Sequence, residues 1–323
     1  MKSSSKPLLG TGSSVTYHLV AFVVVAIWGS TFVSTKMLLL AGLSPAQIFT
    51  LRFIIAYVLL LVYSLIMQKG RGKSFLLFSK CWQDEVLMFA LGVTGGTLYF
   101  LTENSAMNYT TTTNTSLIVS LSPLVASFLI SLFFRSLRLT RIQALGSLMA
   151  ALGVTVVVLN GRFVLHLSPL GDSLAFGAAL CWGFYSMLMI PANLKYDTAF
   201  VTRKVFIYGL LAMIPYYLWK PEEATVFTSS ALFSLDLSVY LNLLFLGCVA
   251  SMLCFLAWNW VLKKLGAVVA TNYVYFNPVT TILFAWAILS EQITIYFLLG
   301  TALILVGMYL ADKKTHGDRS REF

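Results

Sequence analysis

The chain has 323 residues, of which 59% are hydrophobic and 11% charged, and its mean hydropathy is +0.85. Soluble domains have about 45–50% apolar and about 25% charged residues, so this composition excludes a soluble globular protein and indicates an integral membrane protein. The formal net charge of +10 could suggest nucleic-acid binding, but the basic residues form short clusters between apolar blocks, so no nucleic-acid partner is expected.

Ten apolar runs approach the roughly 20 residues that cross a bilayer, and they predict ten transmembrane helices. In chain order they cover residues 19–40, 46–67, 86–101, 112–134, 142–159, 173–191, 205–219, 239–262, 267–289 and 294–311. The third and seventh runs are the shortest. The first run reaches Leu40, beyond the length of a secretory signal, and is therefore interpreted as an uncleaved first helix.

Basic residues in the connecting loops orient these ten helices. With a cytoplasmic N-terminus, inside segments hold 18 of the 22 lysines and arginines, and outside segments hold only Arg162 and Lys220. This bias predicts ten spans and two cytoplasmic ends.

The two halves of the chain repeat each other. Asn104 matches Asn259 and Pro123 matches Pro278, each 155 residues apart, and Trp28 matches Trp182 at nearly the same offset. Five helices per half make the second copy enter the membrane from the opposite face, so the repeats are inverted, as in many transporters. The predicted fold is an all-α integral membrane protein with a cytoplasmic segment 1–17, repeats 18–160 and 172–312, and a cytoplasmic tail 313–323.

Several local motifs accompany this duplication. They are Trp28-Gly29-Ser30-Thr31-Phe32-Val33-Ser34-Thr35-Lys36, Ser44-Pro45, Arg52-Phe53, Glu103-Asn104-Ser105-Ala106, Ser120-Leu121-Ser122-Pro123, and Leu289-Ser290-Glu291 with Gly300 and Gly307. Together they resemble the EamA-type branch of the drug/metabolite transporter superfamily over about residues 18–312. The resemblance implies ten helices, two EamA repeats, an inner-membrane location and export of small metabolites.

Charged residues within or near the helices are few. Lys36 and Arg52 fall within the first two helices, near the same membrane side, and predict a cationic mouth for substrate carboxylate or phosphate groups. The alternative is that both snorkel to the interface or bind backbone carbonyls. Glu103 is placed at an outer helix end, either as a solvated carboxylate or cap, or as a group that titrates at the mouth.

Uncharged polar and aromatic residues supply the remaining candidates for a cavity lining. Hydrogen-bonding side chains at membrane depth need neighbouring helices or a wet cavity, and packing by small hydroxyls is the alternative. Amphipathic rings suit a planar or apolar solute, with an interfacial belt as the alternative. The predicted cavity residues are Trp28, Ser30, Lys36, Arg52, Tyr99, Asn104, Asn114, Ser120, Trp182, Tyr185, Asn272 and Tyr275.

Two prolines and one glutamate receive mechanical or structural roles. Pro123 and Pro278 fall midway through the fourth and ninth helices, where each removes a backbone hydrogen bond, and predict matched kinks for gating; a static kink is the alternative. Glu291 matches an acidic residue that the family commonly has in the turn after the ninth helix. The corresponding turn of the first repeat, Arg135-Ser136-Leu137-Arg138, has no acidic residue. Glu291 is interpreted as structural, with a role in transport as the alternative.

No cofactor or metal is expected, because the three histidines and four cysteines form no ligand pattern, and no concentrated acid, base and nucleophile set indicates an enzyme. The predicted function is a secondary transporter that exports small organic metabolites, amino acids or related amphiphiles, by alternating access. Its partners are the small-molecule substrate and the lipid bilayer; a proton or another coupling ion, and a monomer or homodimer, are left open. The alternative is a non-transporting receptor or scaffold on the same bundle.

Overall fold

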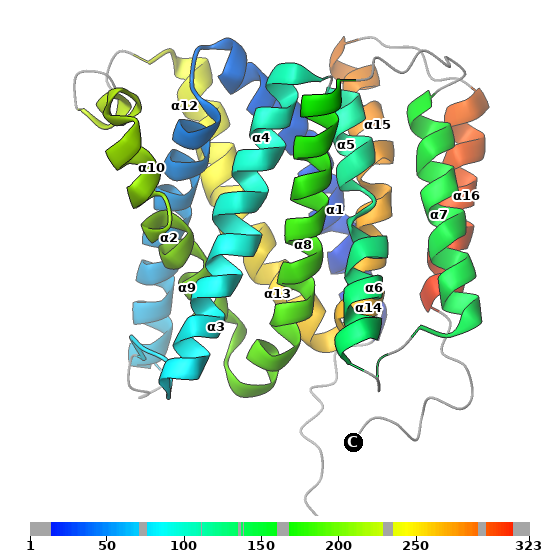
Figure 1. The fold of residues 1–323 in the computed structure, drawn as a ribbon, viewed down its shortest axis with the longest axis horizontal. Helices are drawn as coiled ribbons and strands as arrows, with labels where there is room; N and C mark the ends of the chain where they lie inside the picture. The colour runs from blue at the N-terminus through cyan, green and yellow to red at the C-terminus, as the bar shows by residue number, and fades with distance from the viewer. Residues whose placement is uncertain are drawn as a thin grey trace, which may run out of the picture.

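The computed structural model describes residues 14–70, 76–110, 112–134, 137, 139–159, 168–228, 235–289 and 295–312. Within these ranges every regular element is helical, and Figure 1 shows the helices standing side by side along one common direction. Many large apolar side chains on the outside of the bundle are exposed, among them Leu40, Trp82 and Leu218. Such a surface fits hydrocarbon rather than water, because exposed apolar area costs free energy only in water.

The helices follow the apolar runs in order. In the first half they are α1 (Ser14–Leu40), α2 (Pro45–Gly70), α3 (Trp82–Gly92), η1 (Val93–Leu98), α4 (Tyr99–Tyr109), α5 (Thr112–Val119), α6 (Ser122–Phe133) and α7 (Arg141–Leu159). In the second half they are α8 (Pro169–Lys195), α9 (Thr198–Leu211), α10 (Ile214–Trp219), η3 (Pro221–Phe227), α12 (Leu237–Leu244), η4 (Phe245–Leu253), α13 (Cys254–Leu265), α14 (Ala267–Asn272), η5 (Tyr273–Phe276), α15 (Asn277–Leu289) and α16 (Ile295–Asp312).

By length and composition, seven helical stretches of the described residues can cross a membrane, and two shorter apolar helices lie at 141–157 and 295–311. Several of these stretches join consecutive elements, such as α3, η1 and α4 over Trp82–Tyr109. The expected ninth helix, 267–289, consists of α14, η5 and α15. The count of ten spans therefore stays a prediction, whereas the multi-pass all-helical architecture is confirmed.

The third and seventh helices are longer than predicted. The third runs over Trp82–Tyr109 rather than 86–101, and the seventh begins at Thr198 rather than 205. The sequence interpretation ended the third helix at Leu101 and began the seventh at Val205, because it assigned Glu103 to a helix end and Arg203 and Lys204 to a loop. The structure buries all three side chains inside helices.

Matched π-helical segments interrupt both halves. η1 precedes Tyr99-Phe100 in the first half, and η4 precedes Cys254-Phe255 in the second. A π-helical turn inserts an extra residue and so rotates the side chains that follow; such segments are frequent at functional sites. Phe100 and Phe255, which are 155 residues apart, directly follow these segments.

Helix breaks occur at the predicted proline positions. Pro123 is the second residue of α6, which begins after the break at Ser120 and Leu121, and Pro278 is the second residue of α15, which follows the 3₁₀ segment η5. The first turn of a helix needs no intrahelical N–H partner, so proline fits there. The prolines thus begin new helical segments rather than kink continuous helices, and their role in gating stays a prediction.

The equivalent helices α7 and α16 pack against each other through glycines, and Figure 1 shows them side by side. Gly146 lies against Gly307, and Gly153 against Gly300, so the two helices run antiparallel. Small residues let helix backbones approach closely in membranes. Antiparallel packing of repeat-related helices is the relation that a two-fold axis in the membrane plane produces.

Replacing Gly153 with Ala is expected to lower the free energy of unfolding by about 1–3 kcal/mol, because an added Cβ forces the two backbones apart. At Gly153 that Cβ would lie 2.7 Å from the backbone nitrogen of Ile304. Gly177→Ala is the matched control, since its Cβ would lie 3.6 Å from the Thr102 side chain, an ordinary contact. Unfolding in detergent measures both; equal stability of the two variants would contradict this packing.

Candidate functional site

Six helical elements, α1, α2, α4, α8, α13 and α15, meet around a small cavity inside the bundle. Its volume is about 20 Å³, which is room for about one water molecule. Any solute larger than water therefore requires the surrounding helices to separate. The residues that line it are Trp28, Thr31, Phe32, Arg52, Tyr99, Phe100, Glu103, Trp182, Phe255 and Asn277.

Aromatic rings from both halves form most of the wall. The repeat partners Trp28 and Trp182 meet edge to face with ring centroids 5.3 Å apart, and Phe100 lies 6.2 Å from its partner Phe255. Edge-to-face pairs are favourable arrangements of aromatic quadrupoles. Two repeat-related pairs of rings therefore meet at this cavity, beside Phe32 and Tyr99, which have no aromatic counterpart in the second half.

The charged residues at the cavity, Arg52 and Glu103, both belong to the first half of the chain. Arg52 on α2 is buried; its Nε donates to Ser251 Oγ at 2.9 Å, and its guanidinium lies 4.4 Å from the centroid of the Phe100 ring. Glu103 on α4 is also buried and accepts a hydrogen bond from the Tyr99 hydroxyl at 2.7 Å. The position equivalent to Glu103 in the second half is Trp258.

The two opposite charges face one cavity without joining each other. Within the described part of the chain, no ion pair within 4.0 Å links Arg52 with Glu103. Burying a charge is costly unless it is paired. A ligand that carries both an anionic and a cationic group would pair with Arg52 and Glu103 at once.

Two further polar atoms at the cavity have no hydrogen-bond partner among the described residues. They are the indole Nε1 of Trp182, a donor, and Oδ1 of Asn277, an acceptor, and both residues are buried. Buried polar groups without partners are unusual in folded proteins and call for a ligand or water. One donor and one acceptor at the cavity are thus without a partner among the described residues.

The sequence-predicted residues divide into two groups. Trp28, Arg52, Tyr99 and Trp182 line the cavity. The other predicted lining residues lie outside it in this conformation: Ser30, Lys36, Asn104, Asn114, Ser120, Tyr185, Asn272 and Tyr275.

Several residues of the second group already have partners elsewhere. Lys36 Nζ donates to the backbone oxygen of Met107 at 2.8 Å, so Lys36 and Arg52 do not form a common cationic mouth. Asn114 donates to Asp172 at 2.6 Å, and the Tyr185 hydroxyl donates to Asn259. Tyr185 nevertheless supports the cavity, because its ring lies 5.2 Å from that of Trp182. Glu291 lies outside the described residues.

Sequence reasoning missed six lining residues: Thr31, Phe32, Asn277, Glu103 and the repeat-related pair Phe100 and Phe255. Glu103 was placed at a helix end, but α4 continues six residues beyond it to Tyr109 and buries it. A signal for Phe100 and Phe255 was present, since they repeat at the same 155-residue offset as the recognised pairs. Among the described residues, no group of three His, Cys, Asp or Glu side chains could hold a metal ion.

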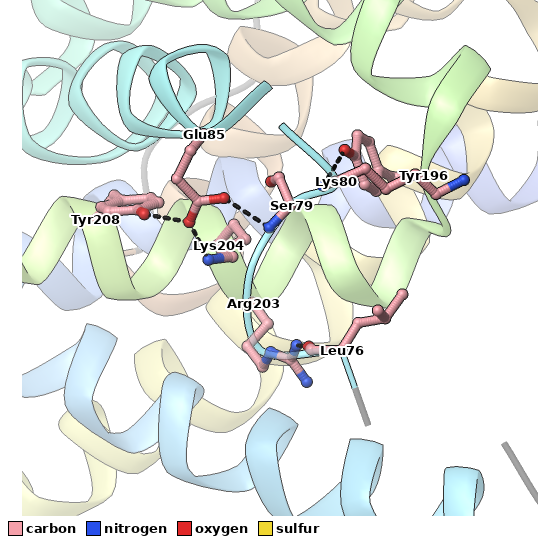
Figure 2. Close-up of polar contacts among 8 residues, drawn as sticks. All are labelled: Leu76, Ser79, Lys80, Glu85, Tyr196, Arg203, Lys204 and Tyr208. Carbon is pink, nitrogen blue, oxygen red and sulfur yellow. Dashed lines mark hydrogen bonds and ion pairs between the residues drawn. The ribbon is translucent and has the colours of Figure 1, made fainter. Parts of the chain in front are cut away.

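At one end of the bundle, a carboxylate network ties the start of α3 to α9, as Figure 2 shows for Glu85. Glu85 accepts hydrogen bonds from Lys204, from the Tyr208 hydroxyl and, at 2.7 Å, from the backbone N–H of Ser79. Beside it, Asp84 binds Lys195 at 2.6 Å. These contacts join the first half to the second and close this end.

Replacing Glu85 with Ala is expected to destabilise the protein by about 3–5 kcal/mol, because Lys204, whose side chain is 5% exposed, would keep a buried charge without its carboxylate. Thermal or denaturant unfolding in detergent measures the loss. The double variant Glu85→Gln with Lys204→Met removes both charges and should recover most of the stability. If the double variant were no more stable than Glu85→Ala, the ion pair would not be the source of the effect.

Contacts between the two halves also close the opposite end. Ser44 donates to the carboxylate of Glu223, and Gln47 donates to the backbone oxygen of Glu223 at 2.9 Å. The Asn114 contact with Asp172 adds a third link. Contacts between the two halves thus hold both ends of the bundle together, and the cavity between them has room for about one water molecule.

Comparison with known proteins places this geometry in context. The sequence model of the EamA-like transporter family matches residues 15–159 and 169–311. An uncharacterized transporter of Archaeoglobus fulgidus is 26% identical over 92% of this chain and 98% of its own length. A solved crystal structure aligns with a TM-score of 0.69 at 20% identity, covering 92% of this chain and 97% of that one, which shows a shared fold.

Two further relatives have more specific names. A probable terminal-alkyne amino-acid exporter of Streptantibioticus cattleyicolor is 25% identical over 73% of this chain and 76% of that protein. A probable amino-acid metabolite efflux pump of Salmonella typhimurium is 26% identical over 90% of this chain and 92% of that protein.

Proposed function

The chain belongs to the EamA-like transporter family, and from that premise we propose that it is a secondary transporter that exports small zwitterionic metabolites of the amino-acid class. The observation that carries the proposal is the buried pair Arg52 and Glu103, which face one aromatic cavity without forming an ion pair. Arg52 would bind the substrate carboxylate, and Glu103 the ammonium group. The names of two relatives, an amino-acid exporter and an amino-acid metabolite efflux pump, support this substrate class.

The side chain of the substrate would lie among Trp28, Trp182 and the two phenylalanines Phe100 and Phe255. Rings offer a large contact area with few hydrogen bonds, so they favour apolar or aromatic groups over polar ones. The unpartnered Trp182 N–H and Asn277 carbonyl would bind remaining polar atoms of the substrate.

Transport would follow alternating access between two inverted repeats, with ten membrane spans in all. The antiparallel packing of α7 and α16 supports the inversion, and the contact networks at both ends supply gates that open in turn. Opening one end would separate α3 from α9, and opening the other end would separate Ser44 from Glu223. The small central cavity would then widen toward the side of the membrane that has opened.

Basic residues support the orientation of the chain in an inner membrane with cytoplasmic termini. Lys80, Lys195 and Lys263 gather at the end that carries the Glu85 network. Positive residues near helix ends favour the cytoplasmic side. Export would therefore proceed away from this end, and the protein would act as a monomer or homodimer.

The experiment that tests this function is transport by the purified protein in liposomes. Pools of labelled amino acids, amines and carboxylic acids are offered with and without a pH gradient, because a buried carboxylate such as Glu103 binds either an ammonium group or a proton. Movement of an amino acid above protein-free liposomes supports the proposal. If no solute moves under any gradient while the protein stays folded, the receptor or scaffold alternative replaces it.

A further inference from the structure

A second, much larger cavity is a groove of about 980 Å³ between α2 on one side and η4 with α13 on the other. The turn between α8 and α9, at Tyr196, Asp197 and Thr198, closes one end of the groove. Its volume is at the upper end of the range for small-molecule sites. The proposed transport function does not use this groove.

The groove faces the outside of the bundle rather than the central cavity. On α13, Leu256 and Trp260 line the groove, whereas Phe255 and Trp258 are buried on another face against the central aromatic rings. The two cavities have no lining residue in common. Leu253, at the end of η4, lines the groove and is 53% exposed. In a membrane this surface is open to lipid.

Positive charge gathers at the groove. Lys80, Lys195 and Lys263 line it, against one lining carboxylate, Asp197. Lys195 binds Asp84, but its side chain remains 54% exposed. Lys263 donates to the backbone oxygen of Tyr196 at 2.8 Å, which leaves its charge unneutralised, and Lys80 is exposed and forms no ion pair within the described part of the chain.

A buried hydroxyl without a partner also lies in the wall. Ser64 on α2 is 4% exposed, and its Oγ has no hydrogen-bond partner among the described residues. It lines the groove together with the apolar side chains of Met67 and Leu253. The site thus combines lysines, one free hydroxyl and an apolar wall.

We propose that this groove binds one anionic phospholipid. The phosphate would lie between Lys80 and Lys263, the Ser64 hydroxyl would donate to an ester oxygen, and the acyl chains would follow Met67, Leu253 and Trp260. Basic pockets between transmembrane helices recognise anionic headgroups in this way. A soluble anion would not use the apolar wall, and a zwitterionic lipid would gain little from the lysines.

The test measures lipid retention by the full chain in neutral detergent, with phosphatidylglycerol or phosphatidylcholine added in mixed micelles and bound lipid counted by native mass spectrometry. We expect one phosphatidylglycerol per protein to be retained, while phosphatidylcholine is lost. Each lysine near an anionic headgroup contributes roughly fivefold to affinity, so the double variant Lys80→Gln with Lys263→Gln should lose about 25-fold.

The charge-matched control is Lys264→Gln with Lys220→Gln, because both lysines lie outside the groove lining. It should retain phosphatidylglycerol like the unchanged protein. A second variant, Ala257→Phe, fills the groove without removing a charge and should displace the lipid as well. Equal retention of the two lipids, equal loss in the control, or full retention by Ala257→Phe would each overturn the proposal.

Discussion

Replacing Arg52 with Gln is expected to reduce transport of a zwitterionic substrate by about 10- to 150-fold. Hydrogen bonds to charged groups contribute about 1.5–3 kcal/mol, and each 1.4 kcal/mol corresponds to a factor of ten. The guanidinium faces the cavity while its Nε is held by Ser251, so the remaining donors are oriented for a carboxylate. Counterflow of labelled phenylalanine in liposomes measures the effect.

Substrate analogues separate recognition from folding at Arg52. Phenethylamine, which lacks the carboxylate, should be transported equally well by the Arg52→Gln variant and the unchanged protein. Lys36→Gln is the control for loss of a positive charge, because Lys36 binds the Met107 carbonyl away from the cavity, and it should transport phenylalanine nearly normally. An Arg52 variant with undiminished phenylalanine counterflow would contradict the assignment.

Replacing Glu103 with Gln is expected to weaken phenylalanine transport by a similar factor, because the neutral amide no longer attracts the substrate ammonium group. The shape of the side chain is kept, and its carbonyl can still accept the hydrogen bond from Tyr99 that the carboxylate accepts at 2.7 Å. Loss of transport would therefore reflect charge rather than packing.

An analogue without the ammonium group separates recognition from folding at Glu103. We expect this analogue, 3-phenylpropionate, to be transported equally by the Glu103→Gln variant and the unchanged protein. A pH gradient that drives phenylalanine through the unchanged protein should have no effect on the variant. Equal losses for phenylalanine and 3-phenylpropionate would show that the substitution damages the bundle instead of the site.

Hydropathy and repeat spacing predicted much of the architecture. The apolar runs at 46–67 and 142–159 correspond closely to α2 and α7, because a helix in hydrocarbon must be apolar along its whole length. Trp28 and Trp182, which the repeat spacing singled out, both line the central cavity and contact each other there.

Charged residues account for most of what the sequence did not predict. Glu103, Arg203 and Lys204 were assigned to helix ends or loops, because a charge inside a membrane helix is costly. The structure offsets that cost with hydrogen bonds that a hydropathy average does not report: Glu103 accepts one from Tyr99, four residues away, and Lys204 donates one to Glu85, 119 residues away.

Backbone irregularity accounts for the rest. The π-helical segment η1 contains two glycines and two threonines, whereas η4 is mostly apolar, and neither composition distinguishes a π-helical segment from an α-helix. They nevertheless set the rotation of the residues that follow, including Phe100 and Phe255 at the cavity. Asn114 and Lys36 were predicted to line a cavity because they are polar or charged. That property alone does not show whether a side chain faces a cavity or forms a hydrogen bond with another residue of the chain.

Competition in liposomes tests most directly whether the cavity recognises both ends of a zwitterion. Counterflow of labelled phenylalanine by the unchanged protein is measured with unlabelled phenylalanine, phenethylamine or 3-phenylpropionate as competitor. We expect each analogue to compete at least about tenfold more weakly than phenylalanine, because each lacks one of the two charged groups that would bind Arg52 or Glu103. Equal competition by all three compounds, or by none, would contradict it.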